Sequence, residues 1–284
     1  MTRHTTIAAI LIAGSVSAAG VASAQDWTGP YVTFAVGGDV VDDDEGEITL
    51  FDTDQNGTFG DTVRTSGGAD AFSSSPTQSA GFCGGKANAN NFDGGCQDDD
   101  EVASAVAGRI GWDWAVGGFI FGVLGEAASM TGRDHTTAFS ITPANYQFAR
   151  GIDGPVYSAR VRVGSPMGRW LPYATAGYAM AEVEETYSTT NGANSFTPLT
   201  NTSDADGFQA GGGLEYAVND RISLGAEYLY TALDVDDPLV VRIGPGTAPL
   251  TNPFRIVNPS GTDTRRQSDE FNHHAFRLTV TARF

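Results

Sequence analysis

One short segment of this 284-residue chain carries oxygen ligands at the spacing of a cation-binding loop. The run from Asp52 to Gly57 (DTDQNG) matches the start of the D-x-[DN]-x-[DN]-G pattern, in which alternate side chains converge on one calcium ion. The glutamate of the twelfth position is missing, although Asp61 lies nearby in the sequence. Two interpretations stay open, a solvated acidic turn or a Ca²⁺ site formed by Asp52, Asp54 and Asn56.

The two cysteines of the chain, Cys83 and Cys96, enclose twelve residues. In an oxidising compartment the simple prediction is an intramolecular disulfide, and the rivals are an intermolecular link or free thiols. Closing so short a ring contributes roughly 3 kcal/mol in the chain-entropy model.

A third group has the residue types that hydrolases use. His273 and His274 lie close to Ser268, Asp269 and Glu270 in the sequence. No nucleophile motif accompanies them, so we predict a hydrated histidine pair and no catalytic residue. The chain is therefore not expected to be an enzyme.

The charge balance restricts the partners. The formal net charge is −18, from 34 acidic and 16 basic residues. Nucleic acids bind through patches of Lys and Arg, so no nucleic-acid partner is expected, whereas cations are favoured.

The N-terminus indicates export. Arg3 precedes an apolar run over residues 7–22, and Ala22-Ser23-Ala24 supplies an A-x-A cleavage pattern. We predict that residues 1–24 are a signal peptide and that residues 25–284 form the mature domain. Export also supplies the oxidising compartment in which a disulfide persists.

The mature chain alternates in steps of two rather than with helical periodicity. At the C-terminus Phe276, Leu278 and Val280 share one face, whereas Arg277 and Thr279 share the other. Charges thus lie on the face of the small and polar residues, which reverses the pattern of a soluble barrel. Eight such segments predict an all-β fold, an eight-stranded antiparallel up-and-down transmembrane β-barrel. The pattern of residues 170–186 does not decide which face points inward.

This alternation points a set of charges into the lumen. A barrel of eight strands is filled by its side chains, and isolated buried charges are costly, so these groups are expected to pair. The prediction is a salt-bridged plug, and the alternative is a gated narrow conduit. The predicted network consists of Arg109, Asp113, Glu126, Arg160, Arg162, Glu215, Glu227 and Arg277.

Short and long connections alternate strictly along the chain. Tight turns are expected near 115–118, 165–170 and 219–221, and long loops at 39–101, 132–154, 187–206 and 237–270. Up-and-down topology then places the turns in the periplasm and the long acidic loops outside the cell.

Aromatic residues lie near the predicted strand ends, where they fit two interfacial girdles. The last residue, Phe284, closes a strand in the way that resembles the signal read by the barrel assembly machinery. The aromatic residues concerned are Trp27, Tyr31, Trp112, Trp114, Trp170, Tyr173, Tyr228 and Tyr230.

From about Gln25 to Phe284 the chain resembles the surface-antigen porin-like barrels of Gram-negative outer membranes, relatives of the opacity proteins and of the OmpA transmembrane domain. The likeness is carried by WTGPYV at 27–32, LPYATAGYA at 171–179, GGGLEY at 211–216, GAEYLY at 225–230 and the terminal Arg283-Phe284. The resemblance implies an eight-stranded barrel with a surface or envelope role and no defined reaction. The very long first loop and the Pro-rich last loop depart from the smaller members.

Taken together, the sequence predicts a protein of the cell outer membrane with a structural or interaction role through its acidic extracellular loops. The alternative is a narrow porin-like channel for small solutes or ions. Expected partners are outer-membrane lipid, lipopolysaccharide and the assembly machinery, and the extracellular ligand is not identified. Calcium is the one cofactor that the residues suggest.

Overall fold

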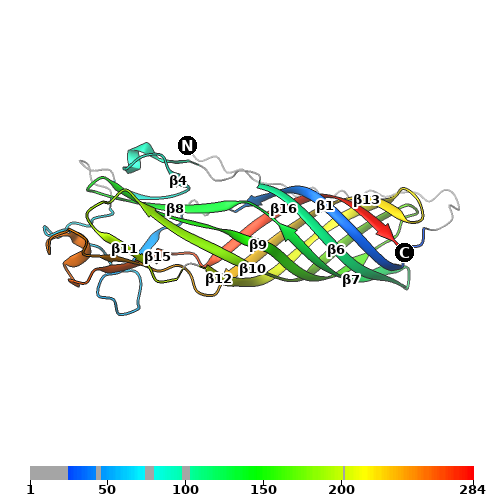
Figure 1. Cartoon of the computed structure of the whole chain (residues 1–284). Helices are drawn as coiled ribbons and strands as arrows, with labels where there is room; N and C mark the ends of the chain where they lie inside the picture. Colours follow the sequence, from blue (N-terminus) through cyan, green and yellow to red (C-terminus); the bar gives the residue numbers. More distant parts are fainter. Residues whose placement is uncertain (1–24, 43–45, 74–79, 98–102, 201) are drawn as a thin grey trace.

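The computed structural model describes residues 25–42, 46–73, 80–97, 103–200 and 202–284. The predicted signal peptide and most of the acidic runs at 42–45 and 98–101 lie outside these residues. Figure 1 shows a long barrel that continues at one end into a second body of strands and loops, which we call the head. No helix within the described ranges is long and apolar enough to cross a membrane.

Eight long strands form a closed antiparallel barrel, so the predicted fold class is confirmed. Each strand pairs with its neighbours in chain order, and the pairs β1–β16 and β9–β10 complete the closure. Closure leaves no unpaired strand edge in lipid. The strands are β1 (Gly29–Val41), β6 (Ala103–Val116), β7 (Phe119–Ser129), β9 (Ala144–Gly164), β10 (Trp170–Thr189), β12 (Thr202–Ala217), β13 (Ile222–Val235) and β16 (Glu270–Arg283).

The predicted short turns all lie at one end of the barrel. Gly117 and Gly118, between β6 and β7, have φ of 59° and 88°, the left-handed conformation that a two-residue hairpin turn requires. Tyr31 is paired with Arg283, so the start of β1 and the end of β16 also lie at this end.

The inside and outside faces follow the predicted alternation. On β6 the side chains of Ile110 and Trp112 are exposed on the outer wall, whereas Arg109 and Asp113 are buried inside. The structure also decides the facing of β10, where Leu171, Tyr173 and Thr175 are buried inside and Tyr178 and Met180 lie outside. Small residues occupy both faces of this strand, which is why its sequence alone was ambiguous.

The predicted girdle position is wrong for three of the aromatic residues. Trp27, Tyr31 and Tyr173 are buried inside the barrel rather than exposed to lipid. They lie near arginine side chains at the short-turn end, with the Arg283 guanidinium 4.7 Å from the Trp27 ring centre and that of Arg162 4.6 Å from the Tyr31 ring centre. Trp112, Trp114, Trp170 and Tyr228 are exposed on the outer wall, as girdle residues should be.

Two rows of carboxylates mark the outer limit of the apolar wall. In one row Glu182 is paired with Asp153 on one side and Asp204 on the other. In the second row Asp234 is paired with Asp206 and Glu270. Outward-facing carboxylates need water. The lipid-facing band therefore lies between these rows and the short-turn end, and the head begins on the other side of the rows.

The four long connections contain more strand than the sequence predicted, and this part of the prediction is wrong. The outer halves of β9 and β10 continue beyond the membrane, where β8 (Arg133–Ser140) and β3 (Gly81–Gly84) extend the same sheet. A second sheet, in the order β11-β14-β15-β2, lies opposite this extended part of the barrel sheet. The remaining elements are β2 (Thr49–Asp52), β4 (Lys86–Ala87), β5 (Cys96–Gln97), β11 (Ser195–Pro198), β14 (Val241–Gly244), β15 (Thr262–Arg266) and the 3₁₀ turns η1 (Phe92–Gly94) and η2 (Pro253–Arg255).

The head has a hydrophobic core of its own. Its aromatic members come from loops far apart in the sequence, with ring centres of Phe51 and Phe72 4.6 Å apart and those of Tyr146 and Phe254 5.6 Å apart. Outside the membrane the head is surrounded by water, so the hydrophobic effect drives the burial of such rings, as in a soluble domain. The core consists of Phe51, Val63, Ala71, Phe72, Ala138, Ala144, Tyr146, Ile243 and Phe254.

Candidate functional site

A charged layer fills the lumen at the short-turn end. Arg162 donates from Nε to Asp113 at 2.9 Å and from Nη1 to Glu215 at 2.6 Å. Arg283 approaches the same two carboxylates, at 3.4 Å from Asp113 and 3.0 Å from Glu215. Two cations therefore face two anions, and the layer is neutral.

A second charged layer fills the middle of the barrel. Glu126 accepts from Arg109 Nε at 2.8 Å, from Arg160 Nη2 at 2.7 Å and from Arg277 Nη1 at 2.5 Å. Glu227 pairs with Arg109 at 2.6 Å and also accepts from the Tyr173 hydroxyl at 2.6 Å. Ion pairs with little exposure thus connect five strands around the lumen, β6, β7, β9, β13 and β16.

All eight charges that the sequence placed in the lumen lie in these two layers. Sequence reasoning left out Arg283, although its position on the face of Arg277 gave the necessary signal. It also left out Tyr173, because the facing of β10 was undecided. Glycines make room for the rings: a Cβ on Gly111 would meet the Tyr31 ring at 2.3 Å, and one on Gly213 the Tyr173 hydroxyl at 2.5 Å.

Above the charges an apolar layer fills the outer end of the lumen. It is formed by inward-facing residues from six of the eight barrel strands, among them Val41, Val156, Val183, Leu233 and Phe271. Each of these five side chains is no more than 4% exposed, so water has little access to this layer.

The predicted hydrated histidine pair is wrong, because alternation along β16 separates its two members. His273 faces the lumen and is 1% exposed. His274 points to the outer wall, where Nδ1 lies 2.7 Å from the Tyr228 hydroxyl.

The head contains buried charges that sequence reasoning missed, because they lie in segments assigned to loops. Arg266 on β15 forms ion pairs with Glu47 and Asp134, and its Nε donates to Glu47 at 2.9 Å. Burial alone would raise the pKa of Glu47, but the hydrogen bonds and charge of Arg266 hold it below its usual value. Burial outweighs the same cation at Asp134, whose pKa is raised. Closer to the membrane, Arg150 pairs with Glu185 at 2.8 Å.

The cysteines lie in the first connection, where the structure joins Cys83 to Cys96 in a disulfide with a Cα–Cα distance of 6.2 Å. Cys83 belongs to β3, which is paired with β8, and Cys96 belongs to the β4–β5 hairpin. Gly85 and Gly95 have φ of 103° and 65°, so the enclosed chain can turn back within a short ring. The bond therefore attaches the hairpin to the edge of the barrel sheet.

We expect reduction of this disulfide to release the hairpin without unfolding the barrel. The ring should lose about 3 kcal/mol of stabilisation in the chain-entropy model. Protease cutting should increase between residues 81 and 97, and alkylation should label two cysteines only after reduction. Labelling of the untreated protein would contradict an intramolecular bond.

The acidic turn at 52–61 brings together three carboxylates. One oxygen from each of Asp52, Asp54 and Asp61 lies within 4.8 Å of the others. The carboxylates also cap the turn itself, since Asp52 accepts from the Gly57 backbone N–H at 2.7 Å and Asp61 from that of Thr53 at 2.9 Å. The Asn56 side-chain oxygen instead accepts from the Thr58 backbone N–H at 2.7 Å, so the predicted third ligand takes part in the turn.

The calcium interpretation remains a prediction, with a direct test. If Ca²⁺ binds here, a chelator should increase protease cutting between residues 52 and 61 and leave the disulfide hairpin unchanged, because the cation would offset the repulsion of three carboxylates. Identical cleavage with Ca²⁺ and with chelator would leave only the solvated turn.

Phe284 directly follows β16 at the short-turn end of the barrel, and its side chain is exposed. Its side chain is 78% exposed, and its backbone N–H donates to the Pro30 carbonyl at 3.1 Å, so only the backbone is held by the barrel. We keep its role as an assembly signal as a proposal. Deleting it should reduce the inserted amount without reducing export.

The family model of the outer membrane protein beta-barrel domain matches residues 63–284, most of the barrel and head. The chain belongs to this family. Its location is accordingly the outer membrane, where the apolar wall contacts lipid and lipopolysaccharide.

Among curated proteins, the 31 kDa outer-membrane immunogenic proteins of Brucella melitensis and Brucella suis are each 27% identical over 171 residues, which cover 54% of this chain and 68% of the relative. Among solved structures, the outer membrane protein OprG from Pseudomonas aeruginosa has a TM-score of 0.45 and 12% identity, covering 92% of this chain and all of OprG. Neisserial surface protein A has a TM-score of 0.33 and 11% identity, covering 90% of this chain and 98% of its own.

Proposed function

We propose that this outer-membrane protein is a non-conducting surface protein that acts through its folded head. The observation that carries the proposal is the filling of the lumen. Two layers of ion pairs and one apolar layer follow one another from the short-turn end to the head. A barrel of eight strands has room for side chains but little for a continuous aqueous path beside them.

The head supports an interaction role in a second way. The described parts of its loops pack on an aromatic core and are held by buried ion pairs and a disulfide, which fix their positions relative to one another. A surface ordered in advance binds with less loss of conformational entropy than a set of flexible loops. A protein whose role ended at the barrel would not need an ordered head beyond the membrane.

Conductance in planar bilayers tests this proposal against the narrow channel that the sequence left open. We expect purified full-length protein to give no steady current, because ions would have to cross the apolar layer formed by Val41, Leu233 and Phe271 together with its neighbours. A control variant in which Leu233 and Phe271 are both replaced by serine should admit water to that layer and raise the frequency of opening. Steady current from the unaltered protein would overturn the proposal.

A further inference from the structure

A groove crosses the apolar outer wall of the barrel on the neighbouring strands β12, β13, β16 and β1 (Figure 1). It has a volume of about 740 Å³, within the ~300–1,000 Å³ of sites for small molecules. The groove forms because short side chains are paired with long ones. Ala226 lies between Leu214 and Leu278, and Gly212 lies beside Tyr228.

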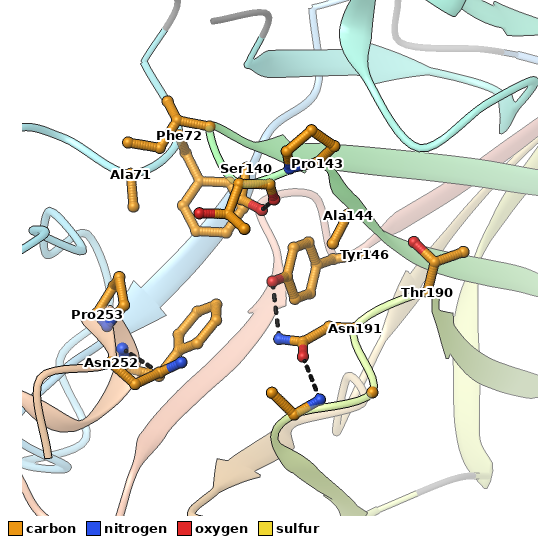
Figure 2. Close-up of a pocket in the computed structure, with 15 residues that line it drawn as sticks. Ala71, Phe72, Ser140, Pro143, Ala144, Tyr146, Thr190, Asn191, Asn252 and Pro253 are labelled. Atoms are coloured by element: carbon orange, nitrogen blue, oxygen red, sulfur yellow. Dashed lines mark hydrogen bonds between the residues drawn. The ribbon is translucent and has the colours of Figure 1, made fainter. Parts of the chain in front are cut away.

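The side chains that border this wall groove are open to a ligand. Their exposed fractions range from 38% for Tyr228 to 66% for Leu278. The pocket of the head is different. Figure 2 shows Asn191 bonded to two of its neighbours there, since it donates to the Tyr146 hydroxyl at 3.0 Å and accepts from the Ala193 backbone N–H at 2.9 Å. Its polar groups are used within the protein, and its rings belong to the head core.

Lipid covers the wall groove, because the groove is continuous with the wall that faces the membrane. In lipid, apolar surface alone does not attract an acyl chain, since the other chains are equally apolar. One chain is preferred only where the wall fits its shape and a polar group holds its headgroup end. The groove supplies the shape, so a specific lipid also requires polar side chains beside it.

Two polar side chains lie at the head-side end of the groove. Tyr228 borders the groove, and its hydroxyl lies 2.7 Å from Nδ1 of His274, which is half-buried on the same wall. A histidine on a lipid-facing wall is costly, and it therefore indicates a function. Tyr228 engages one of the two ring nitrogens. When the Tyr228 hydroxyl donates to Nδ1, Nε2 carries the ring proton and donates to an oxygen of a lipid.

The depth of His274 matches the junction between acyl chains and headgroup. On β16 the outward-facing residues change from Phe276 to His274, then to Asn272 and Glu270. Four residues separate His274 from Glu270, about 13 Å along the strand and roughly 10 Å along the membrane normal once the strand tilt is included. The headgroup region is about 5–8 Å thick on each side of the membrane. Glu270 therefore lies where a headgroup meets water.

Carboxylates above the groove determine the charge of the headgroup. Asp234 is paired with Asp206 on one side and with Glu270 on the other. Like charges directly opposite one another repel. None of the three forms an ion pair with an arginine or lysine of the described residues. They would repel an anionic headgroup, whereas an ammonium group would offset their repulsion.

We propose that the wall groove binds one phospholipid with a terminal ammonium group, of the phosphatidylethanolamine type. One acyl chain lies along Ala226 and Gly212, a phosphate oxygen accepts from His274 Nε2, and the ammonium group points to the row of Asp206, Asp234 and Glu270. This inference goes beyond the proposed surface function and does not depend on it, because a non-conducting barrel and a conducting one present the same wall.

Native mass spectrometry of the full-length protein released from detergent micelles tests the binding. Phosphatidylethanolamine and phosphatidylglycerol with the same acyl chains are offered in equal amounts. We expect one retained phosphatidylethanolamine per protein and little phosphatidylglycerol. Ala226→Leu fills the groove and should abolish this adduct. Ala127→Leu is the matched control, because Ala127 is also an exposed alanine of the outer wall, on β7, but does not line the groove.

Two further variants test the polar contacts. His274→Phe keeps a ring but removes both nitrogens, and it should weaken binding by up to about tenfold, the equivalent of one hydrogen bond. Asp234→Asn combined with Glu270→Gln should bring the ratio of the two retained lipids towards one. Heat-dependent gel mobility confirms that each variant has folded.

Three results would overturn the inference. They are no lipid retained by the unaltered protein, equal retention of the two lipids by the unaltered protein, and retention by Ala226→Leu that equals retention by Ala127→Leu. Displacement of phosphatidylethanolamine by an equal amount of lipopolysaccharide would also overturn it, because an anionic lipid would then be the preferred occupant. Planar-bilayer conductance tests the surface function separately.

Discussion

Replacing Glu126 with alanine is expected to lower the free energy of unfolding of the barrel by about 3–5 kcal/mol. Glu126 is 5% exposed and accepts from three guanidinium groups, those of Arg109, Arg160 and Arg277. Without it, three buried cations share Glu227 as the remaining hydrogen-bonded carboxylate of the middle layer. Urea unfolding in lipid vesicles, followed by tryptophan fluorescence, measures the change.

An exposed ion pair of the head provides the control for Glu126→Ala. Glu184 lies 2.9 Å from Arg133, and the two side chains are 41% and 48% exposed. Water screens such a pair, so Glu184→Ala should change the unfolding free energy by less than about 1 kcal/mol. Equal effects of the two substitutions would mean that the lumen charges do not hold the strands together.

The barrel could be predicted from the sequence because lipid and a narrow lumen impose opposite demands on alternate residues. Leu278 and Arg277 are neighbours on β16, yet one is 66% exposed on the wall and the other is buried among charges. Such contrast, repeated along a strand, determines the facing of every residue in it. Where it is weak, as in the run of Ala, Gly and Tyr on β10, the facing was left open and Tyr173 was placed on the wrong side.

The head could not be predicted, because its order comes from contacts between distant segments. Phe51 and Phe254 belong to one core but are about two hundred residues apart in the sequence. Phe51 lies on a strand of four residues and Phe254 in a 3₁₀ turn of three. An alternation of two or three residues is too short to distinguish a strand from a loop. The ion pairs of Arg266 were missed for the same reason.

Arg266 is the residue of the head whose loss should have the largest effect. Its side chain is buried between Glu47 and Asp134, which come from the first and second long connections, and it lies on β15 in the fourth. Arg266→Met keeps the unbranched apolar stem of the side chain but leaves two buried carboxylates without a cation. We expect the head to lose about 3–5 kcal/mol at pH 7, while the barrel strands remain folded.

The stability of the Arg266→Met head should change with pH in the opposite direction to the stability that Glu47 contributes in the unaltered head. The pKa of Glu47 is below its unfolded value, so its contribution is present above that value and lost as the pH falls through the folded pKa. The raised pKa of Asp134 acts in the other direction, with a contribution that is present at low pH and lost as the pH rises. Without Arg266, burial raises both pKa values above those of the unfolded chain, and the two contributions then have the same sign.

Stability of the Arg266→Met head should therefore increase as the pH falls from 7 towards about 4, where protonation removes the buried charges. Thermal melting followed by near-ultraviolet circular dichroism measures this, because the head core is rich in Phe and Tyr. We expect the barrel to melt separately and at a higher temperature. Arg266→Lys keeps the charge without the forked geometry and should fall between the two proteins. A variant that loses stability on acidification would show that burial of Glu47 and Asp134 does not control their protonation.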